Sequence, residues 1–215
     1  MSPLVTIIAI AGAVWGLVAD RIAARWPAHD DGTIRPIDWR TAAVIGAGSL
    51  GLSVLVARYE SDPGSAVYLG ILVVALVLLF ATDLDQRLLP DVITIPIVIY
   101  AVIGYGAGIG PFVRTPGDLL LAIIAAIAVP VGLYLVSIPF GAGAIGMGDL
   151  KLLFGIGLLA GAARLVAMVV VGALTAAAGI VILLVLRRIT LKSYVPYGPF
   201  LIIGAIWAIT VSGSP

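Results

Sequence analysis

The stretch SAVYLGILVVALVLLFATDLDQRLLPD, residues 65–91, decides the fold class. Its first 18 residues, Ser65–Thr82, carry no charge. As a helix they would span roughly 27 Å, close to the thickness of the hydrocarbon layer of a membrane. The next nine residues, DLDQRLLPD, turn polar at Asp83. An apolar run of membrane length that ends at a carboxylate predicts a transmembrane helix with a polar junction at one end.

The composition of the 215 residues agrees with a membrane protein. Hydrophobic residues make up 62% of the chain and charged residues 11%, whereas about a quarter of the residues in soluble domains are charged. This balance excludes a disordered chain, and the net charge of +1 excludes a nucleic-acid binder of the usual kind. The chain has no cysteine and one histidine, His29, so neither a disulfide framework nor a Cys or His metal cluster can form. We predict one integral membrane domain over residues 1–215, with no metal and no cofactor.

Apolar runs recur along the whole chain and predict an all-α, polytopic membrane helical bundle with about eight transmembrane helices. The first run is not a secretory signal, because no basic residue precedes it. The sixth run has only 12 residues and would cover roughly 18 Å as a helix, less than the hydrocarbon core. The runs are Met1–Ala19, Thr41–Ala57, Ser65–Thr82, Val92–Val113, Asp118–Phe140, Leu152–Ala163, Leu165–Leu186 and Tyr194–Val211.

The distribution of basic residues decides whether the sixth run crosses, since lysine and arginine concentrate on the cytoplasmic side. If all eight runs cross and the N-terminus is extracytoplasmic, nine basic residues face the cytoplasm and three face out. If the sixth run does not cross, the ratio falls to seven against five. We therefore predict eight spans, both termini outside, a sixth helix that extends back through Lys151, and a short cytoplasmic loop over residues 20–40.

Two aspartates, Asp83 and Asp149, lie at cytoplasmic ends of predicted spans and directly abut apolar sequence. An ionisable residue beside a membrane span indicates a functional site. Simpler interpretations exist for each residue alone: Asp149 could be the N-cap of its helix, and Asp83 could be an interface residue that ends a span. We interpret Asp91, after Pro90, as the N-cap of the fourth span, and Asp85 as a solvated residue.

Glycines near Asp149 allow a close backbone approach or a positive φ angle. Gly146 and Gly148 lie in the glycine-rich loop GAGAIGMGD that begins at residue 141. The GxxxG spacings Gly12/Gly16 and Gly157/Gly161 predict helix-packing positions with a structural role only.

Three motifs resemble those of the type IV prepilin peptidases, a family of intramembrane aspartyl proteases. DLDQRLLPDVITIPI, from Asp83, is similar to their first catalytic segment, and GMGDLKLL, from Gly146, is similar to their GxGD segment. VPYGPFL, from Val195, resembles the signature that opens their last helix. The motifs agree in order and spacing, and the resemblance covers roughly residues 65–212.

The resemblance implies catalytic segments at 83–91 and 141–151, with Asp83 and Asp149 as the catalytic aspartates. Amide hydrolysis needs one carboxylate to take a proton from water and one acid to protonate the leaving amine, so two adjacent carboxyls would share a proton. The family resemblance further implies support of the substrate or loop by five residues. These are Gly146, Gly148, Lys151, Pro90 and Asp91. Lys151 could instead be an interface lysine that extends towards the lipid headgroups, and Arg87 has the same ambiguity.

The family's substrates are prepilins and pilin-like (pseudopilin) secretion proteins, whose basic leader is cut at the cytoplasmic face of the bacterial inner membrane. The implied partners are therefore such a substrate helix and membrane lipid, with no nucleic acid. Many members also methylate the product and carry CxxC zinc motifs between the first two spans, where this chain has only Asp20–Arg40 and no cysteine. We predict a peptidase without methyltransferase activity, with Trp26 and Trp39 at the membrane interface and His29 solvated. The alternative is a small transporter or channel with an ion site at the broken segment 141–149.

Overall fold

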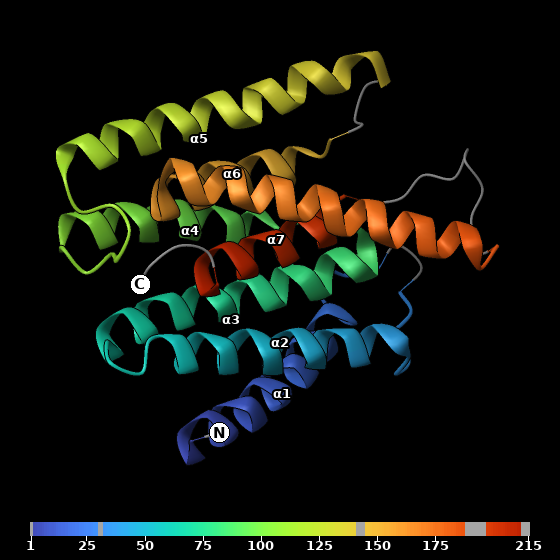
Figure 1. Ribbon diagram of the computed structural model, residues 1–215. Coiled ribbons are helices and arrows are strands. Elements are labelled where there is room, and N and C mark those ends of the chain that lie inside the picture. Colours follow the sequence, from blue (N-terminus) through green and yellow to red (C-terminus); the bar gives the residue numbers. More distant parts are fainter. Residues whose placement is uncertain (1, 30–31, 141–144, 188–196, 212–215) are drawn as a thin grey trace.

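The computed structural model describes residues 2–29, 32–140, 145–187 and 197–211, and this part of the chain contains helices and no strands. Figure 1 shows the helices lying roughly parallel or antiparallel to one another. They are α1 (Pro3–Ala23), α2 (Trp39–Arg58), α3 (Pro63–Gln86), α4 (Asp91–Gly106), α5 (Pro116–Ser137), the 3-10 turn η1 (Ile138–Phe140), α6 (Met147–Val185) and α7 (Gly198–Thr210).

Five of these helices, α1, α2, α3, α5 and α6, are long and apolar enough to cross a membrane, and α4 and α7 are shorter apolar helices. The molecule is thus a polytopic helical membrane bundle, as the sequence predicts. The number of crossings and the side on which the termini lie remain predictions.

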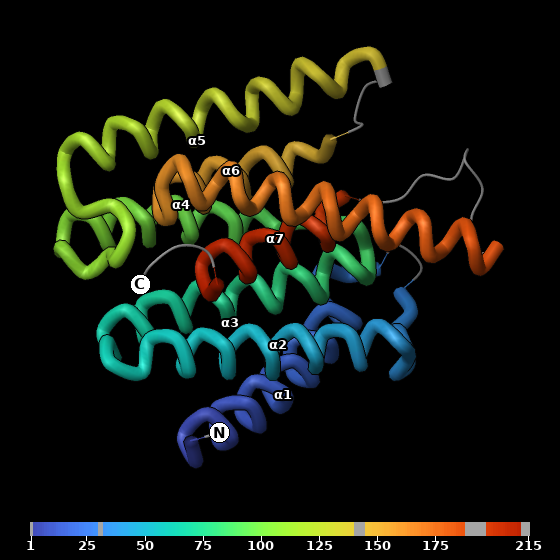
Figure 2. Tube along the Cα trace, viewed as in Figure 1, coloured from blue at the N-terminus to red at the C-terminus, as the bar shows by residue number. Residues whose placement is uncertain are grey.

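Helix α6 contains the sixth and seventh predicted runs. Its backbone is non-helical at Gly161, where φ is 80° and ψ is 171°. Figure 2 shows that the chain reverses there, so that α6 consists of two antiparallel segments. A Cβ on Gly157 would lie 2.8 Å from Leu165 Cδ2, although a straight helix would separate the two residues by about 12 Å. The predicted extension of the sixth helix through Lys151 is confirmed, since α6 begins at Met147.

Helix α3 lies at the centre of the bundle, with α1 and α2 on one side and α4 and α7 on the other (Figure 1). Its side chains Leu69, Leu72, Leu76 and Leu79 are 1% exposed or less. Because α3 is covered on several sides, its C-terminal end is held from several directions. That end carries Asp83.

The predicted packing role is confirmed at three of the four glycines and wrong at the fourth. A Cβ on Gly12 would clash with the carbonyl of Gly48, and one on Gly16 would lie 2.6 Å from the carbonyl oxygen of Val44, so α1 and α2 pack backbone to backbone. Gly157 allows α6 to approach Ala126 of α5. Gly161 is not a helix-packing residue, because its positive φ forms the reversal instead.

Polar caps begin most of the helices. The side chains of Ser2, Asp38, Asp62 and Thr115 accept backbone hydrogen bonds at the first turns of α1, α2, α3 and α5. Helices α6 and α7 have no such side-chain cap. Their uncapped first turns meet at the candidate site.

Candidate active site

Asp83 lies in the last turn of α3, which continues to Gln86, rather than just after the span as the hydropathy pattern predicts. The residue is 5% exposed, and its Oδ2 atom is buried without a hydrogen-bond partner in the described part of the chain. Arg87 ends the helix in the left-handed conformation, and its N–H donates to the Asp83 carbonyl at 2.9 Å. The backbone at Asp83 is therefore fixed by the end of a central helix, while Oδ2 of its carboxyl has no hydrogen-bond partner among the described residues.

Asp149 is the third residue of α6 and is 8% exposed. The N-cap position belongs to Gly146, and no side chain provides a cap hydrogen bond. The N-cap interpretation of Asp149 is therefore wrong. A Cβ on Gly146 would lie 3.5 Å from Asp149 Oδ2, so the carboxyl lies against the backbone of the glycine loop.

Asp83 and Asp149 line the same cavity, whose volume is about 300 Å³. The end of α3 and the beginnings of α6 and α7 meet at one end of the bundle (Figure 1). The cavity is lined by Asp83, Arg87, Leu88, Leu89, Gly146, Met147, Gly148, Asp149, Tyr197 and Gly198. Two carboxyls that are 66 residues apart in the sequence thus share one small polar chamber.

Two glycines make this chamber possible. A Cβ on Gly148 would lie 2.7 Å from Leu89 Cβ, so α6 packs tightly against the loop after α3. A Cβ on Gly198 would clash with the carboxyl of Asp83. Gly148 is thus restricted to glycine by the close approach of Leu89, whereas a Cβ on Gly198 would force the Asp83 carboxyl to shift. Gly198 therefore allows the beginning of α7 to cover Asp83.

Sequence reasoning missed Gly198 and Tyr197 as site residues, although both belong to the quoted motif VPYGPFL. The hydroxyl of Tyr197 donates to the Val169 carbonyl at 3.3 Å, which ties α7 to α6 beside the cavity. Val195 and Pro196, the first residues of that motif, lie outside the described residues.

Lys151, Pro90 and Asp91 do not line the aspartate cavity. Lys151 Nζ donates to both carboxylate oxygens of Asp91 at 2.7 Å, so the pair joins the beginnings of α4 and α6. Lys151 thus pairs with a residue of the protein, whereas a simple interface lysine would extend towards the lipid headgroups. Pro90 is the N-cap of α4 and Asp91 its first helical residue, without a cap hydrogen bond. The N-cap interpretation of Asp91 is therefore wrong.

The loop between α1 and α2 forms a buried ion network with α3. The Asp85 carboxylate lies 2.6 Å from Arg35 Nε, 3.2 Å from Arg40 Nη1 and 3.0 Å from His29 Nε2. Its side chain is 2% exposed. Arg35 also pairs with Asp20 of α1, whose side chain is fully buried. The predictions of a solvated Asp85 and a solvated His29 are therefore wrong, because the sequence does not show that these charges meet.

Arg35 is the centre of this network. Burial acts to lower the pKa of its guanidinium, but its hydrogen bond to Asp20 and the negative charges of Asp20, Asp85 and Asp38 raise that pKa above its ordinary value. Gln86 Nε2 also donates to the Pro27 carbonyl at 2.6 Å. The loop is thereby fastened to the end of α3 that carries Asp83. No group of three or more metal-ligating side chains occurs among the residues that the structure describes.

The fold and site define a polytopic helical membrane protein with two buried aspartates at one end of the bundle. The chain matches the type IV leader peptidase family over residues 70–184, and it belongs to that family. It is 28% identical over 167 residues to the prepilin leader peptidase/N-methyltransferase of Dickeya chrysanthemi, an alignment that covers 75% of this chain and 57% of that relative. The chain thus spans little more than half the length of that relative. No solved structure matches it.

Proposed function

We propose that this chain is an intramembrane aspartyl endopeptidase in which Asp83 and Asp149 activate one water molecule. The observation that carries the proposal is the shared cavity of about 300 Å³, into which α3 and α6 each bring a buried aspartate. Two carboxyls in one small chamber can share a proton, so that one acts as base and the other as acid. Because the pair would titrate as a unit, neither residue has a separate assigned role.

The proposed substrates are prepilins or pilin-like secretion proteins, and the proposed reaction removes their basic leader at the cytoplasmic face of the bacterial inner membrane. Family membership and the relative from Dickeya chrysanthemi support this substrate class. A junction at the membrane surface suits cleavage, because the backbone amides of a helix inside the bilayer are paired and shielded from water. We further propose that this chain does not methylate its product, since it contains no cysteine for a zinc-supported subdomain.

The presence of an apolar groove beside the aspartate cavity supports the proposal that the substrate is an apolar helix. The groove has a volume of about 520 Å³ and lies between α4, α5 and the first half of α6, with Ile127 and Phe154 in its walls. Met147 lines both the groove and the cavity. Pro130 has no N–H, so it cannot make the usual helical hydrogen bond to the carbonyl of Ala126. Both residues line the groove. We expect the substrate's apolar helix to lie here, with its leader junction near Asp149.

The test is cleavage of a leader-bearing pilin precursor from the same genome by the full chain in lipid, followed by mass spectrometry of the product N-terminus. Asp83→Asn and Asp149→Asn should each slow cleavage about a thousandfold, while Asp118→Asn, at the exposed start of α5, should cleave at the parental rate. If both cavity variants cleave like the parent, the catalytic assignment is wrong. If the parent itself leaves every precursor uncut, the proposed substrate class is wrong.

A further inference from the structure

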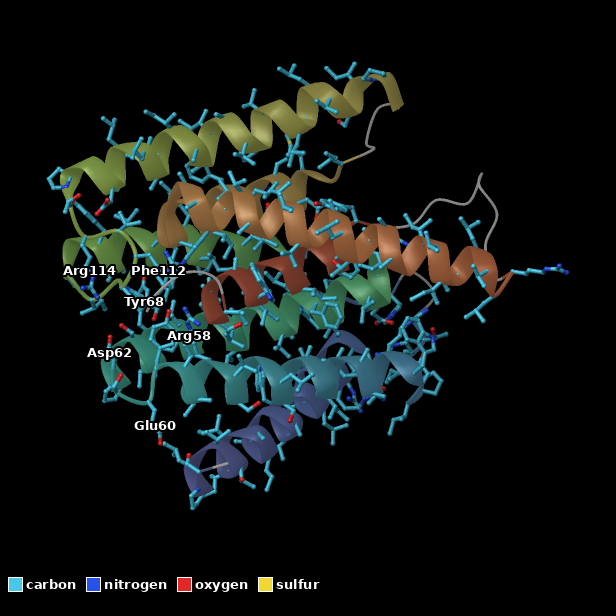
Figure 3. The ribbon with its side chains drawn as sticks, viewed as in Figure 1. Arg58, Glu60, Asp62, Tyr68, Phe112 and Arg114 are labelled. Atoms are coloured by element: carbon cyan, nitrogen blue, oxygen red, sulfur yellow. The ribbon has the colours of Figure 1, made fainter. Side chains whose placement is uncertain are left out.

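A second cavity lies at the end of the bundle opposite the aspartates. It has a volume of about 690 Å³ and lies where α3 begins, α4 ends and the loop to α5 passes. Asp62 caps the first turn of α3 and Asp83 lies in its last turn, so the two cavities are roughly 30 Å apart along the helix. Figure 3 shows Asp62, Tyr68 and Arg114 together at this end. The peptidase mechanism proposed above does not use any of them.

Two tyrosines form a rigid wall of this cavity. The rings of Tyr68 and Tyr100 stack with their centroids 4.5 Å apart and their planes 15° from parallel. The Tyr68 hydroxyl donates to the Tyr100 carbonyl at 3.3 Å, and the Tyr100 hydroxyl donates to the Tyr68 carbonyl at 2.9 Å. A Cβ on Gly104 would clash with the Tyr68 hydroxyl, so a glycine allows α4 to approach. The cavity is therefore preformed, and both hydroxyls are already engaged.

The cavity carries one charge of each sign. The Asp62 carboxylate accepts hydrogen bonds from the Ser65 hydroxyl at 2.6 Å and the Ser65 N–H at 3.1 Å. These bonds, together with the charge of Arg114, lower the pKa of Asp62, so it is ionised at neutral pH. Arg114 lines the same cavity, but no ion pair between Arg114 and Asp62 occurs within the described part of the chain. Opposite charges thus face one space without neutralising each other directly.

The rest of the cavity opens onto an apolar strip of α3. Val67 and Ile71 are four residues apart, so they lie on one face of the helix, and they are 65% and 54% exposed. In a membrane-spanning helix such a strip faces lipid chains. The cavity therefore combines a polar end, with one anion and one cation, and an apolar path that leads along α3.

We propose that this cavity binds a phospholipid with a zwitterionic phosphoethanolamine headgroup. The ammonium group would pair with Asp62, the phosphate with Arg114, and an acyl chain would lie along Val67 and Ile71. Asp62 repels a purely anionic headgroup and Arg114 repels a simple cation, so a ligand that carries both charges fits best. The volume is in the usual range for a small-molecule site and far exceeds that of a single ion. This proposal does not depend on the peptidase function.

Native mass spectrometry of the full chain in detergent, titrated with phosphatidylethanolamine or phosphatidylglycerol, tests the proposal. The parent should retain phosphatidylethanolamine at least tenfold more tightly than phosphatidylglycerol. Arg114→Gln should weaken the binding of both lipids at least tenfold. Asp62→Asn, which keeps a residue that can cap α3, should reverse the preference towards phosphatidylglycerol. Glu60→Gln, which removes an exposed carboxylate two residues from Asp62 that does not line the cavity, should bind like the parent.

Three results would overturn the proposal. The first is equal retention of both lipids by the parent, and the second is unchanged retention in Asp62→Asn and Arg114→Gln. The third is equally tight binding of glycerophosphoethanolamine, which lacks acyl chains, because it would remove any role for the apolar strip. Thermal unfolding without added lipid shows whether each variant is folded, and phosphatidylethanolamine should raise the Tm of the parent but not of Arg114→Gln.

Discussion

Asp83 and Asp85 are two residues apart at the end of α3, and both are buried, yet their surroundings differ completely. Asp85 contacts His29, Arg35 and Arg40, whereas Asp83 has a buried oxygen without a hydrogen-bond partner among the described residues. Two residues along a helix turn the side chain by about 200°, so the carboxyls face opposite sides. One side meets the loop between α1 and α2, and the other meets α6 and α7.

This difference shows that burial alone does not indicate whether a carboxyl group can take part in proton transfer. A buried carboxylate with cationic partners contributes to structure, because removing one partner leaves a charge in a medium of low polarity. A buried carboxyl that is held only by the backbone, beside a second one in a small cavity, is available for proton transfer. The partners of a buried charge, more than its depth, separate the two roles.

Asp83→Asn should have the largest effect on activity and little effect on stability. We expect the cleavage rate to fall about a thousandfold, the order that acid–base catalysis supplies, because the amide cannot exchange the proton. The free energy of unfolding should not fall, since no ion pair is lost. Cleavage kinetics and thermal unfolding of the same preparation measure both quantities. A variant that loses stability and activity together would contradict the distinction between the two aspartates.

Arg35→Met should destabilise the fold by about 3 kcal/mol, because it leaves Asp20 and Asp85 buried without their shared cation. Arg25→Met is the matched control, since Arg25 makes an exposed hydrogen bond to the Arg21 carbonyl. Thermal unfolding in the same detergent compares the two variants. Equal Tm values for both would show that the network does not hold the loop against α3.

Gly198→Ala should slow cleavage about tenfold, because the added Cβ forces α7 and the Asp83 carboxyl apart and overpacking costs about 1–3 kcal/mol. Gly132→Ala is the control: nothing lies within 4 Å of a Cβ at that position in the middle of α5. The control should cleave at the parental rate and unfold no earlier than the parent. Parental kinetics for Gly198→Ala would argue against the close approach of α7 to Asp83.

Lys151→Met should have the smallest effect. Its partner Asp91 is half exposed, and surface ion pairs contribute less than about 1 kcal/mol. We expect the cleavage rate to change less than about threefold, and Asp91→Asn to behave in the same way. A double-mutant cycle on unfolding measures the pair. A hundredfold loss of activity in Lys151→Met alone would assign this lysine to the catalytic machinery after all.

The sequence predicted the helical membrane fold well, because long uncharged runs have few alternative structures. It also predicted that α6 includes Lys151. It failed where the outcome depends on contacts between segments. Helix α3 continues past Asp83 and ends only at Arg87, whose left-handed backbone stops it. Hydropathy does not show where such a backbone stop lies. His29 and Asp85 are 56 residues apart, and their contact has no signal in the spacing.

The amino-acid sequence by itself determined that this chain is a bundle of apolar helices and that Asp83 and Asp149 are exceptional, because so few charges interrupt its apolar runs. Only the tertiary structure decided that these aspartates share one cavity, that Gly198 closes over Asp83, and that Asp85 is neutralised by the loop. Hydrophobicity acts on each segment separately, so local sequence is sufficient to predict helices. The distances between side chains on different helices arise from packing, which depends on all the helices at once.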